Sequence, residues 1–279
     1  MQSFFKKLPR YSLRLLLAYL VYIFTGGVLA YLLPRQARNL PQTDSFYGIG
    51  RGPDRAVLVE EPQDAFARRV EVIRTAQSTL DVCYHCVKSG ETTECFFAEL
   101  LRAADRGVRV RVLLDGTVGG LSGARSNIAL ALRAHPNIEY RIYNPVDLLR
   151  PWEWNALLHD KFILADDRML LLGGRNIGDE YFAPPGYEGA VTYDRDVLVL
   201  NDLAGTPDSS ESVTAQAKIY MDTLWDAPET DKFGTLSPSR RADGLAAQEY
   251  LKETAARWEA AAPSFYLPSE PASQCAVPT

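Results

Sequence analysis

The residues of this chain that are best suited to chemistry lie in one short stretch between His159 and Asn176. Within it, His159, Lys161 and Asp166 form the pattern H-x-K-x4-D, and a G-G-x-N pattern follows at Gly173, Gly174 and Asn176. An imidazole, a fixed ammonium and an amide donor around one point suit phosphoryl transfer, because that reaction depends mainly on positioning and neutralising phosphate oxygens. These residues are therefore candidates for an active site.

The same stretch predicts a β-hairpin that gathers these side chains. Side chains alternate along a strand, so His159 and Lys161, two residues apart, share one face. Two apolar runs, 162–165 and 169–172, flank a turn at 166–168. Because the second run returns antiparallel to the first, we expect Asn176 to lie beside the histidine and the lysine. The competing interpretation is a core histidine next to a surface lysine, which the complete spacing disfavours.

Helices and strands alternate along the rest of the chain and must position this hairpin. The residue pattern predicts helices over 64–77, 92–105, 126–134, 209–225 and 240–261. It predicts strands over 79–87, 108–114, 138–143 and 194–200. This alternation indicates an α/β (α+β) fold with a mixed β-sheet flanked by helices.

The composition argues against a general nucleic-acid binder, because the formal net charge is −5 and the pI is about 5.4. Four cysteines are present, and Cys83 and Cys86 form a C-x-x-C pattern. Residues three apart on a strand face opposite sides, which places these two thiols beyond disulfide reach. Since no second C-x-x-C or H-x-x-H completes a zinc site, we interpret the thiols as buried.

The N-terminus predicts a membrane anchor. Four basic residues precede an uncharged apolar stretch, Leu15–Leu33, which is long enough to cross a bilayer. The alternative is a cleaved signal peptide, but the stretch exceeds a usual apolar signal region and has no clean A-x-A site before Pro34. The small excess of basic residues upstream favours an N-terminus inside and a domain outside, hence on the periplasmic side.

The hairpin pattern resembles the phospholipase D superfamily, whose signature is H-x-K-x4-D followed at the same distance by G-S-x-N or G-G-x-N. The resemblance extends to Leu80-Asp81, 103–111, Leu113-Leu114-Asp115, 173–182 and 193–197, which are similar to the first lobe of bacterial cardiolipin synthase-like proteins. It covers roughly residues 56–265. One departure is plain: that family carries two H-x-K-x4-D lobes in one chain, whereas this sequence has one.

The resemblance implies a covalent mechanism and roles for the site residues. One histidine attacks the phosphodiester and the partner motif's histidine protonates the leaving alcohol, so His159 is either nucleophile or acid. Lys161 and Asn176 would hold phosphate oxygens, Asp166 would mainly fix the hairpin, and Gly174 would lack the serine hydroxyl of many relatives. A carboxylate on the following strand, Asp194 or else Asp196, would orient the imidazole. No metal or other cofactor is expected.

These arguments predict four segments: a membrane anchor at 1–40, a linker at 41–62, a catalytic lobe at 63–237, and an inter-lobe helix with a tail at 238–279. The function they favour is a phosphodiesterase or phosphatidyltransferase of the bacterial inner membrane that acts on phospholipids. It would pair with a second H-x-K-x4-D lobe or with a second copy. The alternatives are a dimeric, single-motif nuclease-type phosphodiesterase and an inactive half-lobe with a binding role.

Overall fold

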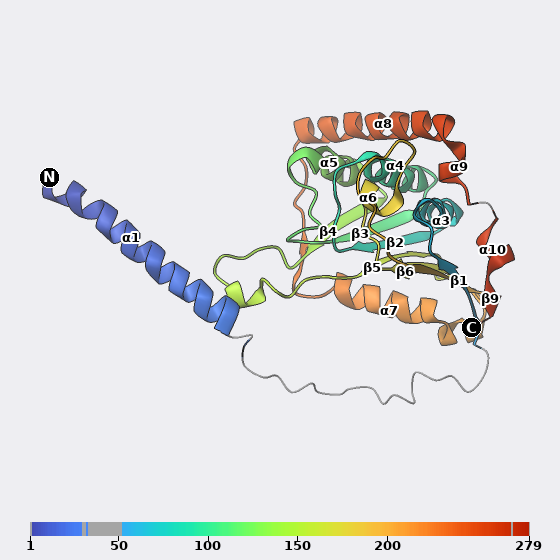
Figure 1. Cartoon of the computed structure of the whole chain (residues 1–279), viewed down its shortest axis with the longest axis horizontal. Coiled ribbons are helices and arrows are strands. Elements are labelled where there is room, and N and C mark those ends of the chain that lie inside the picture. The colour runs from blue at the N-terminus through green and yellow to red at the C-terminus, as the bar shows by residue number, and fades with distance from the viewer. Residues whose placement is uncertain (1, 30–31, 33–51, 269, 279) are drawn as a thin grey trace.

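The structure is a computed structural model that describes residues 2–29, 32, 52–268 and 270–278 (Figure 1). Its strands are, in chain order, β1 (Asp54–Val59), β2 (Thr79–Tyr84), β3 (Arg109–Asp115), β4 (Ile138–Tyr143), β5 (Lys161–Ala165), β6 (Met169–Gly173), β7 (Asp196–Asn201), β8 (Thr230–Lys232) and β9 (Val277–Pro278). Its longer helices are α1 (Gln2–Phe24), α3 (Pro62–Thr75), α4 (Glu91–Asp105), α5 (Ser126–Ala134), α7 (Val213–Trp225) and α8 (Pro238–Ala261). Its short helical segments are η1 (Thr25–Leu29), η3 (Gly123–Arg125), η4 (Pro151–Glu153), α6 (Asp179–Phe182), η5 (Pro207–Glu211), α9 (Pro263–Tyr266) and α10 (Ala272–Cys275).

All the described strands form one mixed sheet in the order β8-β4-β3-β2-β5-β6-β7-β1-β9. Strands β2, β3 and β4 run parallel to one another, and the other pairs are antiparallel. The predicted hairpin is β5–β6, in which Phe162 pairs with Leu172 and Ala165 with Met169. It lies at the centre of the sheet because β5 also pairs with β2, where Tyr84 faces Lys161.

The two faces of the sheet are covered unequally (Figure 1). Helices α3, α4 and α5 pack on one face, and α8 lies over α4 and α5 as an outer layer. Helix α7 packs on the other face, where Met221 and Trp225 meet Phe162 and Leu164 of β5. The predicted fold class, a mixed sheet flanked by helices, is confirmed.

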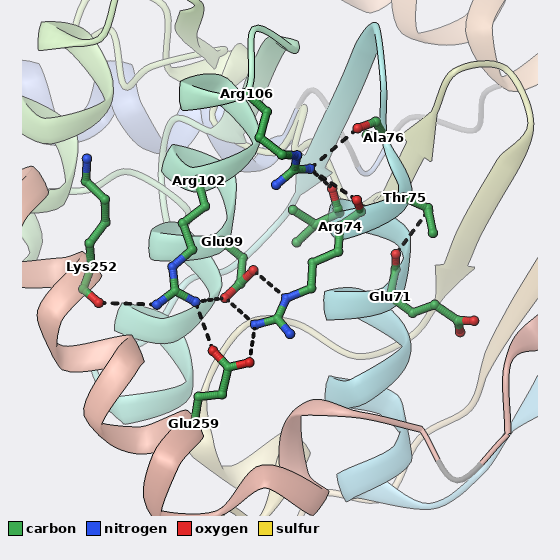
Figure 2. Close-up of polar contacts among 10 residues, drawn as sticks. Glu71, Arg74, Thr75, Ala76, Glu99, Arg102, Arg106, Lys252 and Glu259 are labelled. Carbon is green, nitrogen blue, oxygen red and sulfur yellow. Dashed lines mark hydrogen bonds and ion pairs between the residues drawn. The ribbon is translucent and has the colours of Figure 1, made fainter.

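A cluster of charged side chains holds α8 against the body of the fold (Figure 2). Glu99 of α4 is buried and accepts two hydrogen bonds of 2.9 Å from Arg74 of α3. Arg102 also donates to Glu99, and both arginines reach Glu259 of α8 at 3.1 and 2.9 Å. Because each buried charge has an opposite partner, the cluster fixes the spacing of three helices without leaving an unpaired ion.

Two segments differ from the sequence-based expectation. Strand β2 ends at Tyr84, three residues earlier than predicted, because the chain then turns toward residues 176–177 and only Val87 forms a bridge, with Ile177. As a result, Cys83 is buried but Cys86 is partly exposed. Within the segment expected to be a linker, residues 41–51 lie outside the described part, whereas 54–59 form β1 and pair with β7.

The described residues include one helix apolar and long enough to span a membrane, Tyr11–Leu29, with a mean hydropathy of 1.7 and no residue buried in the protein interior. It overlaps the predicted anchor Leu15–Leu33, of which residues 30, 31 and 33 lie outside the described part. Length and composition make it a candidate span.

Candidate active site

His159 and Lys161 lie side by side at the start of the hairpin. His159 precedes β5 and is exposed, whereas Lys161, the first residue of β5, is 7% exposed. The Lys161 ammonium donates to the His159 carbonyl at 2.7 Å and lies 3.4 and 3.5 Å from its Nδ1 and Nε2. The ammonium thus lies beside the imidazole at nearly equal distances from its two nitrogens, and its hydrogen bond to the carbonyl fixes it there.

The Lys161 ammonium is held in a partly desolvated position. Burial lowers its pKa from the ordinary value, while the carboxylates of Asp160 and Asp194 act in the opposite direction. The ammonium thus lies near the Asp160 and Asp194 carboxylates and beside the exposed His159 imidazole. This arrangement suits a cation that binds an incoming phosphate oxygen.

A second histidine contacts the first. The His85 ring lies 4.5 Å from the His159 ring, centroid to centroid, at an interplanar angle of 51°. Its Nδ1 is 2.9 Å from the Leu158 carbonyl and 4.0 Å from Asp115, and burial lowers the pKa of this imidazole. Since a carbonyl only accepts, Nδ1 carries the proton.

Asp115 is a site residue that sequence reasoning did not single out. Its carboxylate is fully buried and accepts from the backbone N–H groups of Thr117, Val118 and Leu158 at 2.9, 3.0 and 2.9 Å. It thereby fixes the residue just before His159. Strands β2 and β3 run parallel and end at the same edge of the sheet, beside the start of β5. The place of Asp115 at the end of the predicted strand 108–114 was therefore the signal that could have identified it.

Asn176 is joined to the histidines through the backbone. Its Oδ1 accepts from the Cys86 N–H at 3.0 Å, and its Nδ2 donates to the Tyr181 hydroxyl at 3.2 Å. Cys86 directly follows His85, so this contact links the G-G-x-N segment to the two rings. An amide nitrogen carries two hydrogens, and among the described residues Nδ2 donates to Tyr181 alone, so its second hydrogen is available to a substrate oxygen.

Asp166 lies at the other end of β5 from His159. It adopts a left-handed φ of 52°, and its carboxylate accepts from the backbone N–H groups of Gln77, Ser78 and Thr79 at 2.6, 2.8 and 2.8 Å. These bonds tie the hairpin turn to the start of β2. The structure thus places Asp166 in a bracing position, away from the histidine.

Asp194 and Asp196 lie in very different environments. Asp194 is exposed, and its carboxylate accepts from the Arg195 N–H at 2.8 Å. Asp196 is 1% exposed and is paired with two buried arginines, Arg69 at 2.9 Å and Arg175 at 3.1 Å. Within the described residues neither carboxylate bonds to His159, but Asp194 acts electrostatically on Lys161. Asp196 is committed to a structural ion pair.

Gly174 lies directly against the Asp194 carboxylate. A Cβ atom at this position would overlap both carboxylate oxygens, so a side chain here must displace Asp194. Because Asp194 is exposed, it has room to rotate away. The glycine, which has no side chain, therefore leaves space for the Asp194 carboxylate.

We expect Gly174→Ser to leave the fold intact but to reduce activity about tenfold, because it moves Asp194 away from Lys161. Phosphodiester turnover should be measured for Gly174→Ser, Asp194→Ala and the double variant. If the serine acts through Asp194, it should cost little further activity in the Asp194→Ala background. Full additivity of the two losses would contradict this explanation.

Residues 70–199 match the protein family described as cardiolipin synthase, PLD-like domain. This range contains all the site residues named above except Arg69. Within the described residues, no cluster of three or more His, Cys, Asp or Glu side chains is arranged to hold a metal ion.

The chain is also similar to individual proteins. An uncharacterized protein of Helicobacter pylori (strain ATCC 700392 / 26695) is 39% identical over 138 residues, which cover 46% of this chain and 27% of the relative. Cardiolipin synthase C of Escherichia coli (strain K12) is 39% identical over 152 residues, which cover 51% of this chain and 31% of that protein. The matched part thus spans less than a third of each relative.

Among solved structures, NucT from Helicobacter pylori has a similar fold. The TM-score is 0.50 at 15% sequence identity, and the match covers 64% of this chain and 99% of that chain. At this identity the likeness concerns the fold.

Proposed function

Because the chain belongs to the phospholipase D superfamily, we propose that it is a phosphodiesterase or phosphatidyltransferase that acts on phospholipids through a phosphohistidine intermediate. The observation that carries the proposal is the exposed His159 imidazole beside the buried Lys161 ammonium. Phospholipid is favoured over other phosphodiesters by the family description and by the relative named as a cardiolipin synthase.

In the proposed reaction, the unprotonated ring nitrogen of His159 attacks the phosphorus. An N–P bond forms, the P–O bond to the leaving alcohol breaks, and that alcohol takes a proton from an acid on the opposite side. Water or a second alcohol then attacks the phosphohistidine and releases His159. Lys161 and the second Nδ2 hydrogen of Asn176, which is not bonded to Tyr181, bind the non-bridging oxygens, where negative charge concentrates in the transition state.

The acid on the opposite side is not His85. Nucleophile and acid must enclose the phosphorus and the leaving oxygen, which requires about 6 Å or more between their nitrogens for an in-line displacement. The two rings pack against each other at 4.5 Å between centroids, and the His85 Nδ1 donates to the Leu158 carbonyl, so His85 does not face His159 across a phosphoryl group. His85 therefore packs beside the nucleophile and helps to position it.

The third histidine of the chain, His135, is equally unsuitable. It bonds to Asp105 at 3.1 Å. It also precedes β4, whereas His85 follows β2; because these strands run in the same direction, the two histidines lie at opposite ends of the strands. We therefore propose that the opposing histidine comes from a second H-x-K-x4-D lobe or from a second copy of this chain. The division of the chain into anchor, lobe and inter-lobe helix belongs to the same proposal, with β1 counted in the lobe because it pairs with β7.

We expect the isolated chain to be weakly active or inactive as a monomer, and to gain activity with a partner. Turnover of a short-chain phospholipid should be followed across protein concentration in detergent, with the oligomeric state measured by sedimentation. An excess of His159→Ala protein distinguishes the two sources of the second histidine, because it should inhibit the wild type only if two copies share a site. Full activity in a strictly monomeric sample would refute the two-histidine proposal.

A further inference from the structure

The loop between β4 and β5 presents apolar side chains to solvent at its tip. It leaves the sheet at Asn144 and returns at Leu158, directly before His159. The exposed fractions are large for apolar residues: Val146 53%, Leu148 61%, Leu149 73%, Trp152 42% and Leu157 42%. Neighbouring apolar residues exposed in this way mark an interaction surface more often than single exposed residues do.

The loop is braced by its own hydrogen bonds. Asn144 donates to the carbonyls of Glu153 and Ala156 at 2.7 and 3.0 Å, and the Trp154 indole donates to the Asp147 carbonyl at 2.6 Å. The charges at the tip are paired, because Arg150 reaches Asp147 at 2.8 Å and Glu153 at 3.0 Å. The tip therefore keeps Leu148 and Leu149 outward in a fixed shape instead of folding them onto the core.

The tip lies along the candidate membrane span. The Tyr19 hydroxyl donates to the Leu148 carbonyl at 3.0 Å, and the Tyr22 hydroxyl donates to the Leu149 carbonyl. The Tyr22 ring also meets the Trp152 ring edge-on at 6.2 Å.

The contact continues to the end of the span. A Cβ at Gly27 would lie only 3.2 Å from the Pro151 carbonyl oxygen, so the two backbones approach closely there. Tyr19 and Gly27, which bound these contacts, are eight residues apart, or about 12 Å at an α-helical rise. The tip therefore lies along the C-terminal part of the candidate span.

We propose that the loop tip Val146–Trp152 inserts into the lipid bilayer beside the candidate span. This inference rests on the proposed function, in which Tyr11–Leu29 anchors the protein. The occupant of the surface is lipid, because a segment in contact with a membrane-spanning helix shares its surroundings, and the tip exposes leucines while its charges are paired. Since the loop ends at Leu158, insertion holds His159 at the bilayer surface, where phospholipid phosphates lie.

The test places a polarity-sensitive fluorophore on the tip of the full-length protein. Leu149→Cys is labelled and reconstituted into vesicles of phosphatidylethanolamine and phosphatidylglycerol that contain lipids with a quencher on the upper acyl chain. Leu245→Cys on α8 is the matched control, because Leu245 is also an exposed leucine but lies on the outer helix layer. The signal of the labelled parent protein, which has four native cysteines, is subtracted.

We expect strong quenching and a blue-shifted emission at position 149 and neither at position 245. Equal, weak quenching at both positions in vesicles that retain the protein after alkaline carbonate extraction would overturn the insertion and leave the anchor standing. A shift at position 149 that depends on protein density, without lipid quenching, would also overturn it and indicate contact between copies. Release of the protein by carbonate would instead contradict the membrane anchor, and with it the insertion of the loop tip.

Discussion

Replacing His159 with alanine is expected to abolish phosphodiester turnover, by on the order of 10⁴-fold or more, because no other group forms the covalent intermediate. The other histidines do not substitute: His85 is fixed by the Leu158 carbonyl, and His135 bonds to Asp105. Lys161→Ala should be similarly severe, since no other described ammonium lies within hydrogen-bonding distance of the His159 ring.

The measurement is turnover of phospholipid by purified protein together with its competent partner, lobe or second copy. His135→Gln is the matched control and should retain activity, because it removes a histidine remote from the site. Mass spectrometry of protein quenched during turnover should show a phosphatidyl adduct on wild type and none on His159→Ala. Near-normal turnover by His159→Ala would show that the assignment of this residue is wrong.

Replacing Asp196 with alanine is expected to lower the free energy of unfolding by about 3–5 kcal/mol, because it leaves two buried guanidinium groups without their shared counter-ion. Arg69 and Arg175 are both almost completely buried, and each bonds to Asp196 Oδ2. Burial alone would lower the pKa of Arg69, but Asp196 and Tyr84 raise it, so the arginine stays charged and needs the carboxylate.

The matched control is Asp194→Ala, two residues earlier and exposed, whose effect on stability should stay within about 0.5 kcal/mol. Thermal unfolding of both variants in the same detergent should separate them by about 10 °C. If the two variants unfold at the same temperature, the Asp196 ion pair is not a major part of the stability of this fold. The comparison also separates a stability effect from the activity effect expected for Asp194.

The elements that the sequence predicted correctly are those with local signals. The helix at α3 was visible because Phe66, Val70 and Ile73 recur at helical spacing, and all three are buried. The hairpin was visible because apolar runs flank Asp166, whose left-handed φ and backbone contacts make the turn. Such signals depend on residues a few positions apart, so one sequence suffices to find them.

The parts that the sequence did not predict depend on contacts between distant segments. His85 gave no signal of its own, because its position beside His159 follows from the pairing of β2 with β5. The sequence also left open whether Asp194 or Asp196 faces the site. The arginines that bury Asp196 come from α3 and from the G-G-x-N segment, and no local pattern reveals that triple contact.

The pairing of β1 has a consequence for how the protein folds. Strand β1 is made early in synthesis, yet it pairs with β7, Asp54 opposite Asn201, and with β9, Ala56 opposite Val277. Arg175 donates to the carbonyls of Val59 and Glu60 at the end of β1, whereas the hairpin β5–β6 closes locally. Because distant pairings close late, we expect the segment that carries Asn176 to gain its contacts with β1 late in folding. Catalytic competence and completion of the sheet are therefore expected to arise in one cooperative step.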